Sequence, residues 1–109
     1  DRFLPSKCTF SSGLACLDHR ATPAALDVVL QNSLGYDITV TAAYAAGCTY
    51  NTPVLPYAVS NGDKYSPNFA CSNAGISKYN GQVNIIYTTP SDVGGLTHNN
   101  TGQVTSRIG

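Results

Sequence analysis

Residues 25–44 read Ala-Leu-Asp-Val-Val-Leu-Gln-Asn-Ser-Leu-Gly-Tyr-Asp-Ile-Thr-Val-Thr-Ala-Ala-Tyr. Apolar residues alternate with other residues on both sides of a turn-like centre, and a period of two is typical of a half-buried strand. The alternating apolar positions are Leu26, Val28, Leu30, Ile38, Val40, Ala42 and Tyr44. Gly35 can adopt the positive φ that a tight turn needs. The stretch therefore predicts two antiparallel strands that form one wall of a β-sandwich.

The second wall is expected from the C-terminal half of the chain. Residues 82–87 alternate in the same way, with Val83, Ile85 and Tyr87 on one face, and residues 103–108 close the chain as a final strand. Clusters of Gly, Pro and Asn separate the strands, and the chain has no helical periodicity. We therefore expect an all-β fold, an antiparallel immunoglobulin-like β-sandwich of about seven strands. Because the chain contains no tryptophan, an antibody-type core is excluded.

The chain is long enough, at 109 residues, for one modest core. We expect a single domain, in which residues 1–24 form an N-terminal stapled segment and connector and residues 25–109 form the sandwich. Residues 18–20 are polar, and Pro23 excludes a central strand nearby. The first 24 residues are therefore expected to be mostly irregular, with an exposed connector around His19.

Four cysteines indicate the environment in which the protein works. None of them forms the Cys-x-x-Cys pair that zinc sites and thioredoxin-like centres use, so two disulfides are expected, and with them an oxidising, extracellular environment. Of the three possible connectivities we favour the local one, Cys8–Cys16 and Cys48–Cys71. On the chain-entropy model these bridges contribute about 2.5 and 3.5 kcal/mol to the free energy of unfolding.

Charged side chains are scarce, with six Lys and Arg residues against six Asp and Glu residues. A neutral chain has no electrostatic footprint for nucleic acid or for an anionic membrane, so neither is expected as a partner. No stretch reaches the roughly 20 apolar residues of a membrane helix, and residues 1–5 do not resemble a signal peptide. A neutral surface rich in Thr, Asn and Ser suits a protein that packs against copies of itself.

The chain has two histidines, His19 and His98. The residue types of a catalytic triad occur in the pairs Asp18-His19 and Ser91-Asp92. His19 stands among polar residues, which favours a structural or surface role. His19, His98, Asp63 and Asp92 are residue types that could ligate a metal ion. No ligand spacing supports such a site. We therefore expect no catalysis, no metal and no cofactor.

Aromatic and amide side chains offer the remaining candidate sites. Tyr44 and Tyr87 are in phase with apolar strand positions and are expected in the core. The other tyrosines, expected in or near loops where they could bind sugar or a partner subunit, are Tyr36, Tyr50, Tyr57, Tyr65 and Tyr79. Residues 99–101, Asn-Asn-Thr, match the N-glycosylation pattern, which makes Asn99 a candidate site in a predicted loop.

A family resemblance rests on several segments taken in order. They are residues 8–16 (Cys-Thr-Phe-Ser-Ser-Gly-Leu-Ala-Cys), 30–40 (Leu-Gln-Asn-Ser-Leu-Gly-Tyr-Asp-Ile-Thr-Val), the later pair Cys48 and Cys71, 79–87 (Tyr-Asn-Gly-Gln-Val-Asn-Ile-Ile-Tyr), 96–98 (Leu-Thr-His) and 102–104 (Gly-Gln-Val). The ordered set resembles the soluble β domain of archaeal type IV pilin-like and archaellin-like proteins, which are made with a class III signal peptide. No single motif in the set is highly specific.

This resemblance implies a structural subunit of an extracellular, cell-surface filament whose partners are copies of itself. Members of the family usually carry an N-terminal apolar helix that packs in the filament core, and the sequence given shows none before Asp1. Without that helix, domains could still join by strand addition at an open sheet edge. The alternative is a secreted adhesin or a carbohydrate- or protein-binding module that recognises a host surface or a glycan. Neither interpretation needs membrane contact from this segment.

Overall fold

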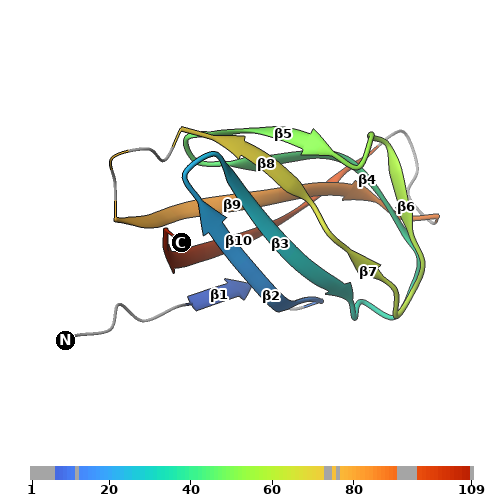
Figure 1. Ribbon diagram of the computed structural model, residues 1–109. Helices are drawn as coiled ribbons and strands as arrows, with labels where there is room; N and C mark the ends of the chain where they lie inside the picture. The colour runs from blue at the N-terminus through green and yellow to red at the C-terminus, as the bar shows by residue number, and fades with distance from the viewer. Residues whose placement is uncertain (1–6, 12, 73–74, 76, 91–95, 109) are drawn as a thin grey trace.

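The computed structural model describes residues 7–11, 13–72, 75, 77–90 and 96–108, and this part of the chain is all-β (Figure 1). Its strands are, in chain order, β1 (Lys7–Phe10), β2 (Leu14–Thr22), β3 (Ala25–Asn32), β4 (Ile38–Ala45), β5 (Cys48–Thr52), β6 (Tyr57–Val59), β7 (Lys64–Tyr65), β8 (Asn68–Cys71), β9 (Lys78–Thr88) and β10 (His98–Arg107). Among the described residues, no helix has the length and apolar character needed to span a membrane.

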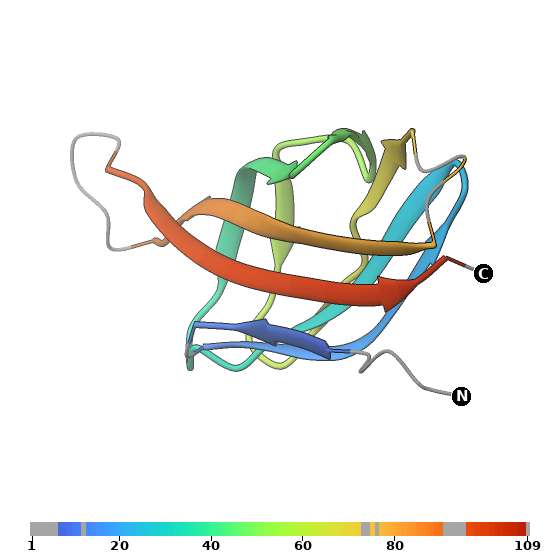
Figure 2. The same cartoon turned by 90° about the vertical axis from the view of Figure 1, so that its left-hand side faces the viewer.

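The strands form two antiparallel sheets that pack face to face. Sheet A has the order β1-β10-β9-β4-β6, and sheet B has the order β2-β3-β8-β5, with the short β7 also paired to β3. Figure 2 shows β9 and β10, in orange and red, running in front of β2 and β3. Without β1, β6 and β7, the other strands reproduce in chain order the ABED and CFG sheets of a constant-type immunoglobulin domain. The predicted immunoglobulin-like sandwich is therefore confirmed, with three short strands added to it.

The hairpin predicted at residues 25–44 is wrong, because its two strands lie in different sheets. β3 pairs with β2 on one side and with β7 and β8 on the other, whereas β4 pairs with β9 and β6. Both edges of each strand are thus occupied, and the segment between them crosses from one sheet to the other. The predicted apolar faces still meet in one core, in which the following residues are fully buried: Leu26, Val28, Leu30 and Val40.

A β-bulge in β4 reverses the predicted orientation of its second half. The pairing with β9 shifts between Val40 and Ala42, so one extra residue of β4 is inserted there. Beyond the bulge Ala43 is buried, whereas Tyr44 is 60% exposed. The prediction that Tyr44 belongs to the core is therefore wrong, and the same prediction for the buried Tyr87 is confirmed.

The N-terminal region, expected to be mostly irregular, contributes one strand to each sheet. β1 pairs with β10 at the edge of sheet A, and β2 pairs with β3 at the edge of sheet B. The predicted Cys8–Cys16 disulfide is confirmed, but it joins the edges of two sheets rather than closing a local hairpin. His19 lies within β2 and not in an exposed connector.

The second predicted disulfide, Cys48–Cys71, is also confirmed, and it joins neighbouring strands of one sheet. The two cysteines stand directly opposite each other in the pairing of β5 with β8. The bridge therefore reinforces the edge of sheet B instead of connecting the two halves of the sandwich. Both cysteine pairs among the described residues are oxidised, which indicates an oxidising environment outside the cytosol.

Strands β9 and β10 are longer than the sequence predicts. β9 extends from Lys78 to Thr88, beyond the predicted residues 82–87, and β10 begins at His98 rather than at residue 103. The two strands pair along the whole described length of β10 and lie beside β4 in the same sheet. They consequently face β3, as predicted, but are neighbours of β4 and not its opposite wall.

Asn32, the last residue of β3, holds the crossing between the sheets. Its side chain is buried, and its Nδ2 donates to the carbonyl oxygens of Tyr36 (2.9 Å) and Val59 (3.1 Å). Its Oδ1 accepts the backbone N–H of Leu34 (3.0 Å). One amide therefore links sheet B, the crossing segment and strand β6 of sheet A, where the sequence predicts only a turn residue.

Candidate functional site

The outward side of sheet A carries uncharged polar side chains around one exposed tyrosine. Strands β9 and β10 turn their apolar residues into the core, so the alternate residues face outward. These outward residues and Tyr44 of β4 form a group that we call the amide face. Its members are Tyr44, Asn80, Gln82, Asn84, Thr101, Gln103 and Thr105. The strand register places Tyr44, Asn84 and Thr101 in one row across three strands.

Hydrogen bonds between these side chains hold them in defined orientations. Thr101 Oγ1 donates to Asn84 Oδ1 (2.9 Å), and Asn84 Nδ2 donates to Gln82 Oε1 (3.4 Å). Gln103 Nε2 donates to Asn80 Oδ1 (2.7 Å). Each glutamine thus uses one end of its amide, and the other ends, Gln82 Nε2 and Gln103 Oε1, have no hydrogen-bond partner within the described part of the chain.

The charged residues of the same strands stand at one end of sheet A. Lys78 and Arg107 lie opposite each other where β9 begins and β10 ends, and Lys7 is the first residue of β1. Lys7 stands in the row of Asn80 and Thr105, whereas the rows that contain Tyr44, Gln82 and Gln103 carry no formal charge. The uncharged rows can exchange hydrogen bonds with a ligand, but they offer a polyanion no cation to pair with.

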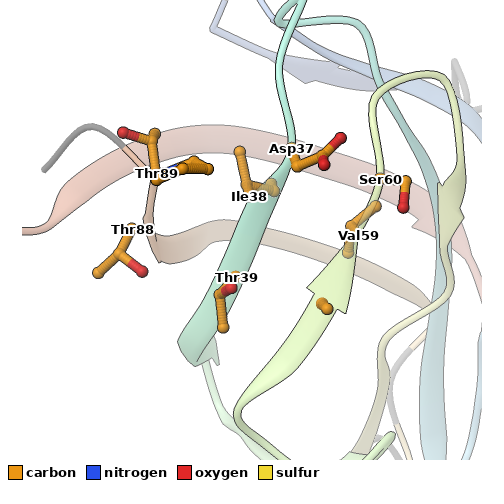
Figure 3. A pocket seen from close by; sticks show the side chains of 9 residues that line it. Asp37, Ile38, Thr39, Val59, Ser60, Thr88 and Thr89 are labelled. Atoms are coloured by element: carbon orange, nitrogen blue, oxygen red, sulfur yellow. The ribbon is translucent and has the colours of Figure 1, made fainter.

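A hollow of about 300 Å³ opens where β4 begins, between the ends of β6 and β9 (Figure 3). Thr39 of β4 stands in the strand register between Ala58 of β6 and Thr88 of β9, and all three line the hollow. The Asp37 carboxylate and the Ser60 hydroxyl also line it. The lining is therefore rich in hydroxyl groups and contains one carboxylate, which makes it a further candidate for binding a polar ligand.

The tyrosines expected in loops lie mostly in strands. Tyr65 and Tyr79 are buried in β7 and β9, and Tyr50 is half-buried in β5, so these three are not exposed for binding a sugar or a partner. Tyr36 lies in the segment between β3 and β4 and is exposed, as predicted. Tyr57 is partly exposed in β6. Sequence reasoning missed the most exposed tyrosine of the chain's described part, Tyr44, because no sequence signal marks the bulge before it.

Three tyrosines form a structural cluster beside strands β5, β6 and β7. Tyr57 stacks on Tyr65 with ring centroids 5.6 Å apart, and Tyr65 Oη donates to Tyr50 Oη (2.9 Å). Tyr50 Oη in turn donates to the carbonyl oxygen of Pro53. Burial raises the pKa of Tyr65 above its ordinary value, and the hydrogen bond to Tyr50 raises it further. The Tyr50 and Tyr65 hydroxyls serve as donors that hold the edge of the sandwich together.

The structure does not bring the two histidines together. His19 lies in β2 of sheet B, whereas His98 begins β10 of sheet A and stacks on Tyr87 with ring centroids 5.4 Å apart. The Oδ1 of Asp18 accepts the backbone N–H of His19 (2.8 Å), a local contact within β2. Residues 91–92, the Ser-Asp pair considered above, lie outside the described residues. The described residues therefore do not assemble the triad drawn from the sequence.

One group of potential metal ligands occurs among the described residues, and it consists of Cys8, Cys16 and His19. Its two sulfur atoms are joined in a disulfide, so neither is the thiolate that binds a metal ion. Asp63, one of the metal ligands considered from the sequence, lies in the turn before β7 and is not part of this group. The group is therefore better explained as the stapled edge of the sandwich.

Asn99, the candidate glycosylation site, lies in β10 opposite Ile86, so its predicted loop position is wrong. Its side chain is exposed. The hydroxyl of Thr101, the third residue of the acceptor pattern, donates to Asn84. Glycosylation at Asn99 remains a prediction.

Comparison of the chain with protein-family profiles, with curated proteins and with solved structures found no match. The resemblance to pilin-like and archaellin-like proteins therefore rests on the chain's own motifs. Any function must accordingly be argued from the residues and from their arrangement in the sandwich.

Proposed function

We propose that the chain is a structural outer domain of an extracellular surface filament, with copies of itself as its partners. The observation that supports this proposal is a disulfide-stapled sandwich whose formal net charge is zero. Subunits of a filament lie against one another over large areas. A formal net charge of zero avoids the repulsion that like-charged copies would experience.

The edges of the two sheets favour assembly through faces over assembly by strand addition. Sheet A ends in β1 and β6, which have four and three residues, and Pro56 immediately precedes β6. The outer strands of sheet B are β2 and β5, and each contains a bulge, between Cys16 and Asp18 and between Tyr50 and Thr52. Short, bulged or proline-flanked edges resist pairing with another chain. We therefore infer that copies meet through their exposed faces.

Electron microscopy of the full-length gene product on its native cells tests this proposal. Antibodies raised against the 109-residue chain should decorate filaments along their length. The gene sequence upstream of Asp1 provides a second test, because the proposal expects a basic leader followed by about twenty apolar residues. A protein found only as a diffusible monomer, with no filament decorated by the antibody, would rule the proposal out.

A further inference from the structure

We propose that the amide face is a binding site for an uncharged polysaccharide, whether or not the chain assembles into a filament. The proposal begins with Tyr44, whose ring is 60% exposed on a strand that is otherwise packed between β9 and β6. Apolar C–H groups on one face of a sugar ring pack against an exposed aromatic ring, and a tyrosine combines such a flat surface with a polar hydroxyl. Tyr44 therefore supplies a stacking platform beside the amides of β9.

The amides beside Tyr44 supply hydrogen bonds of fixed direction. Asn84, its neighbour in the register, is held between the Thr101 hydroxyl and the Gln82 amide. Gln82 and Gln103 are directly paired across β9 and β10, and each has one amide end engaged by a neighbouring asparagine. The remaining ends present one donor and one acceptor on a pair of residues that face each other across the two strands. Sugar hydroxyls both donate and accept, so they match this pair, and pre-oriented groups lose little conformational entropy on binding.

The absence of charge from the rows of Tyr44, Gln82 and Gln103 selects among ligand classes. Nucleic acids and acidic polysaccharides bind through Lys and Arg, and the cations of the described parts of β1, β9 and β10 lie at one end of the sheet, at Lys7, Lys78 and Arg107. Protein interfaces take most of their affinity from clustered aromatic and Arg side chains, whereas the amide face holds one aromatic residue. A neutral polyol is the ligand that stacking and uncharged hydrogen bonds suit best.

The hollow at the start of β4 extends the site along the same side of the sheet. Thr39 and Thr88 face outward, on the same side as Tyr44 and Asn84, because the inward residues of these strands include the buried Val40. Five residues of strand separate Thr39 from Tyr44, a distance of about 16 Å at the usual rise. Hydroxyl groups therefore continue the polar surface over a length that suits a chain of sugars better than a single one.

Titration of the 109-residue chain with neutral polysaccharides tests this site. Soluble mannan, dextran and β-glucan are the probes, and heparin is the charged comparison. In two-dimensional NMR spectra of the ¹⁵N-labelled protein, the side-chain amide signals of Gln82, Asn84 and Gln103 should shift with at least one neutral probe. Tyr44→Ala should weaken that binding at least tenfold, and Tyr44→Phe should retain most of it.

Tyr36→Ala is the matched control, because Tyr36 is 45% exposed and lies in the segment between β3 and β4. This variant should bind like the parent protein, and thermal melts should show that all variants are folded. Gln82→Ala provides a second test within the site and should also weaken binding. Three outcomes would overturn the proposal: no neutral probe binds, Tyr44→Ala binds as well as the parent, or Tyr44→Ala abolishes self-association in sedimentation experiments while saccharides have no effect. None of these outcomes decides whether filaments form on cells.

Discussion

Replacing Asn32 should destabilise the fold far more than replacing an asparagine elsewhere on the chain. Asn32→Ala removes three hydrogen bonds, one to the Val59 carbonyl oxygen in sheet A and two within the crossing segment, to the Tyr36 carbonyl oxygen and from the Leu34 N–H. Val59 is buried, and a buried polar group left without a partner costs about 1–3 kcal/mol. Tyr36 is exposed and Leu34 is only partly buried, so water can replace those two bonds at about 0.5–1 kcal/mol each.

The sum of these contributions is a loss of about 3 kcal/mol in the free energy of unfolding, which corresponds to a fall of roughly 15 °C in Tm for a domain of this size. Urea unfolding followed by circular dichroism, with both disulfides intact, measures this loss directly. Asn61→Ala is the matched control, because Asn61 precedes Gly62 in an exposed turn and should cost less than about 0.5 kcal/mol.

Asn32→Asp separates loss of the donor from loss of packing. The carboxylate keeps the acceptor for the Leu34 N–H, but it places negative charge against the Tyr36 and Val59 carbonyl oxygens. We expect the pKa of the introduced carboxyl to lie above its usual value in the folded state, so the destabilisation relative to the parent should grow as pH rises from 4 to 7. A cost of Asn32→Ala no larger than that of Asn61→Ala would refute the role assigned to Asn32.

The remaining predictions concern the bulge, the packing of β1, the tyrosine cluster and the disulfides. Val40→Asp should unfold the domain, because Val40 is fully buried. Tyr44→Asp should leave Tm within a few degrees of the parent value, because Tyr44 is exposed. Equal effects of the two substitutions would contradict the bulge between Val40 and Ala42. Gly102→Ala should cost about 1–3 kcal/mol in urea unfolding, since its Cβ would stand 2.6 Å from ring atoms of Phe10, and an unchanged midpoint would contradict this packing. Burial raises the pKa of Tyr65, so the folded state keeps a proton that the unfolded state releases above about pH 10. The free energy of unfolding should therefore fall as pH rises beyond that value, and it should fall less steeply in Tyr65→Phe. Parallel pH dependences in the parent and the variant would contradict this role of Tyr65. Reduction of the denatured protein should add four hydrogens in mass spectra, and thiols detected in the native protein would contradict the two bridges.

The candidate site could be predicted from the sequence only in part. Alternation along residues 82–87 already places Gln82 and Asn84 on the face opposite Val83 and Ile85. What alternation cannot supply is the neighbour of each strand. The amide face exists because β10 pairs with β9 in a register that sets Gln103 beside Gln82. That pairing joins residues far apart in the chain, and local patterns carry no information about it.

The sequence by itself determined the all-β class and the inward positions of β3 and β9, because a period of two is a local property, and it favoured the disulfide pairing that the structure confirms. Only the tertiary structure decided that β3 and β4 belong to different sheets, since this choice depends on which strands occupy their edges. The tertiary structure also turned Tyr44 outward, because the bulge after Val40 adjusts β4 to its partner β9. The alternation of apolar residues along a strand shows which side chains share a face, whereas the pairing with other strands determines what that face packs against.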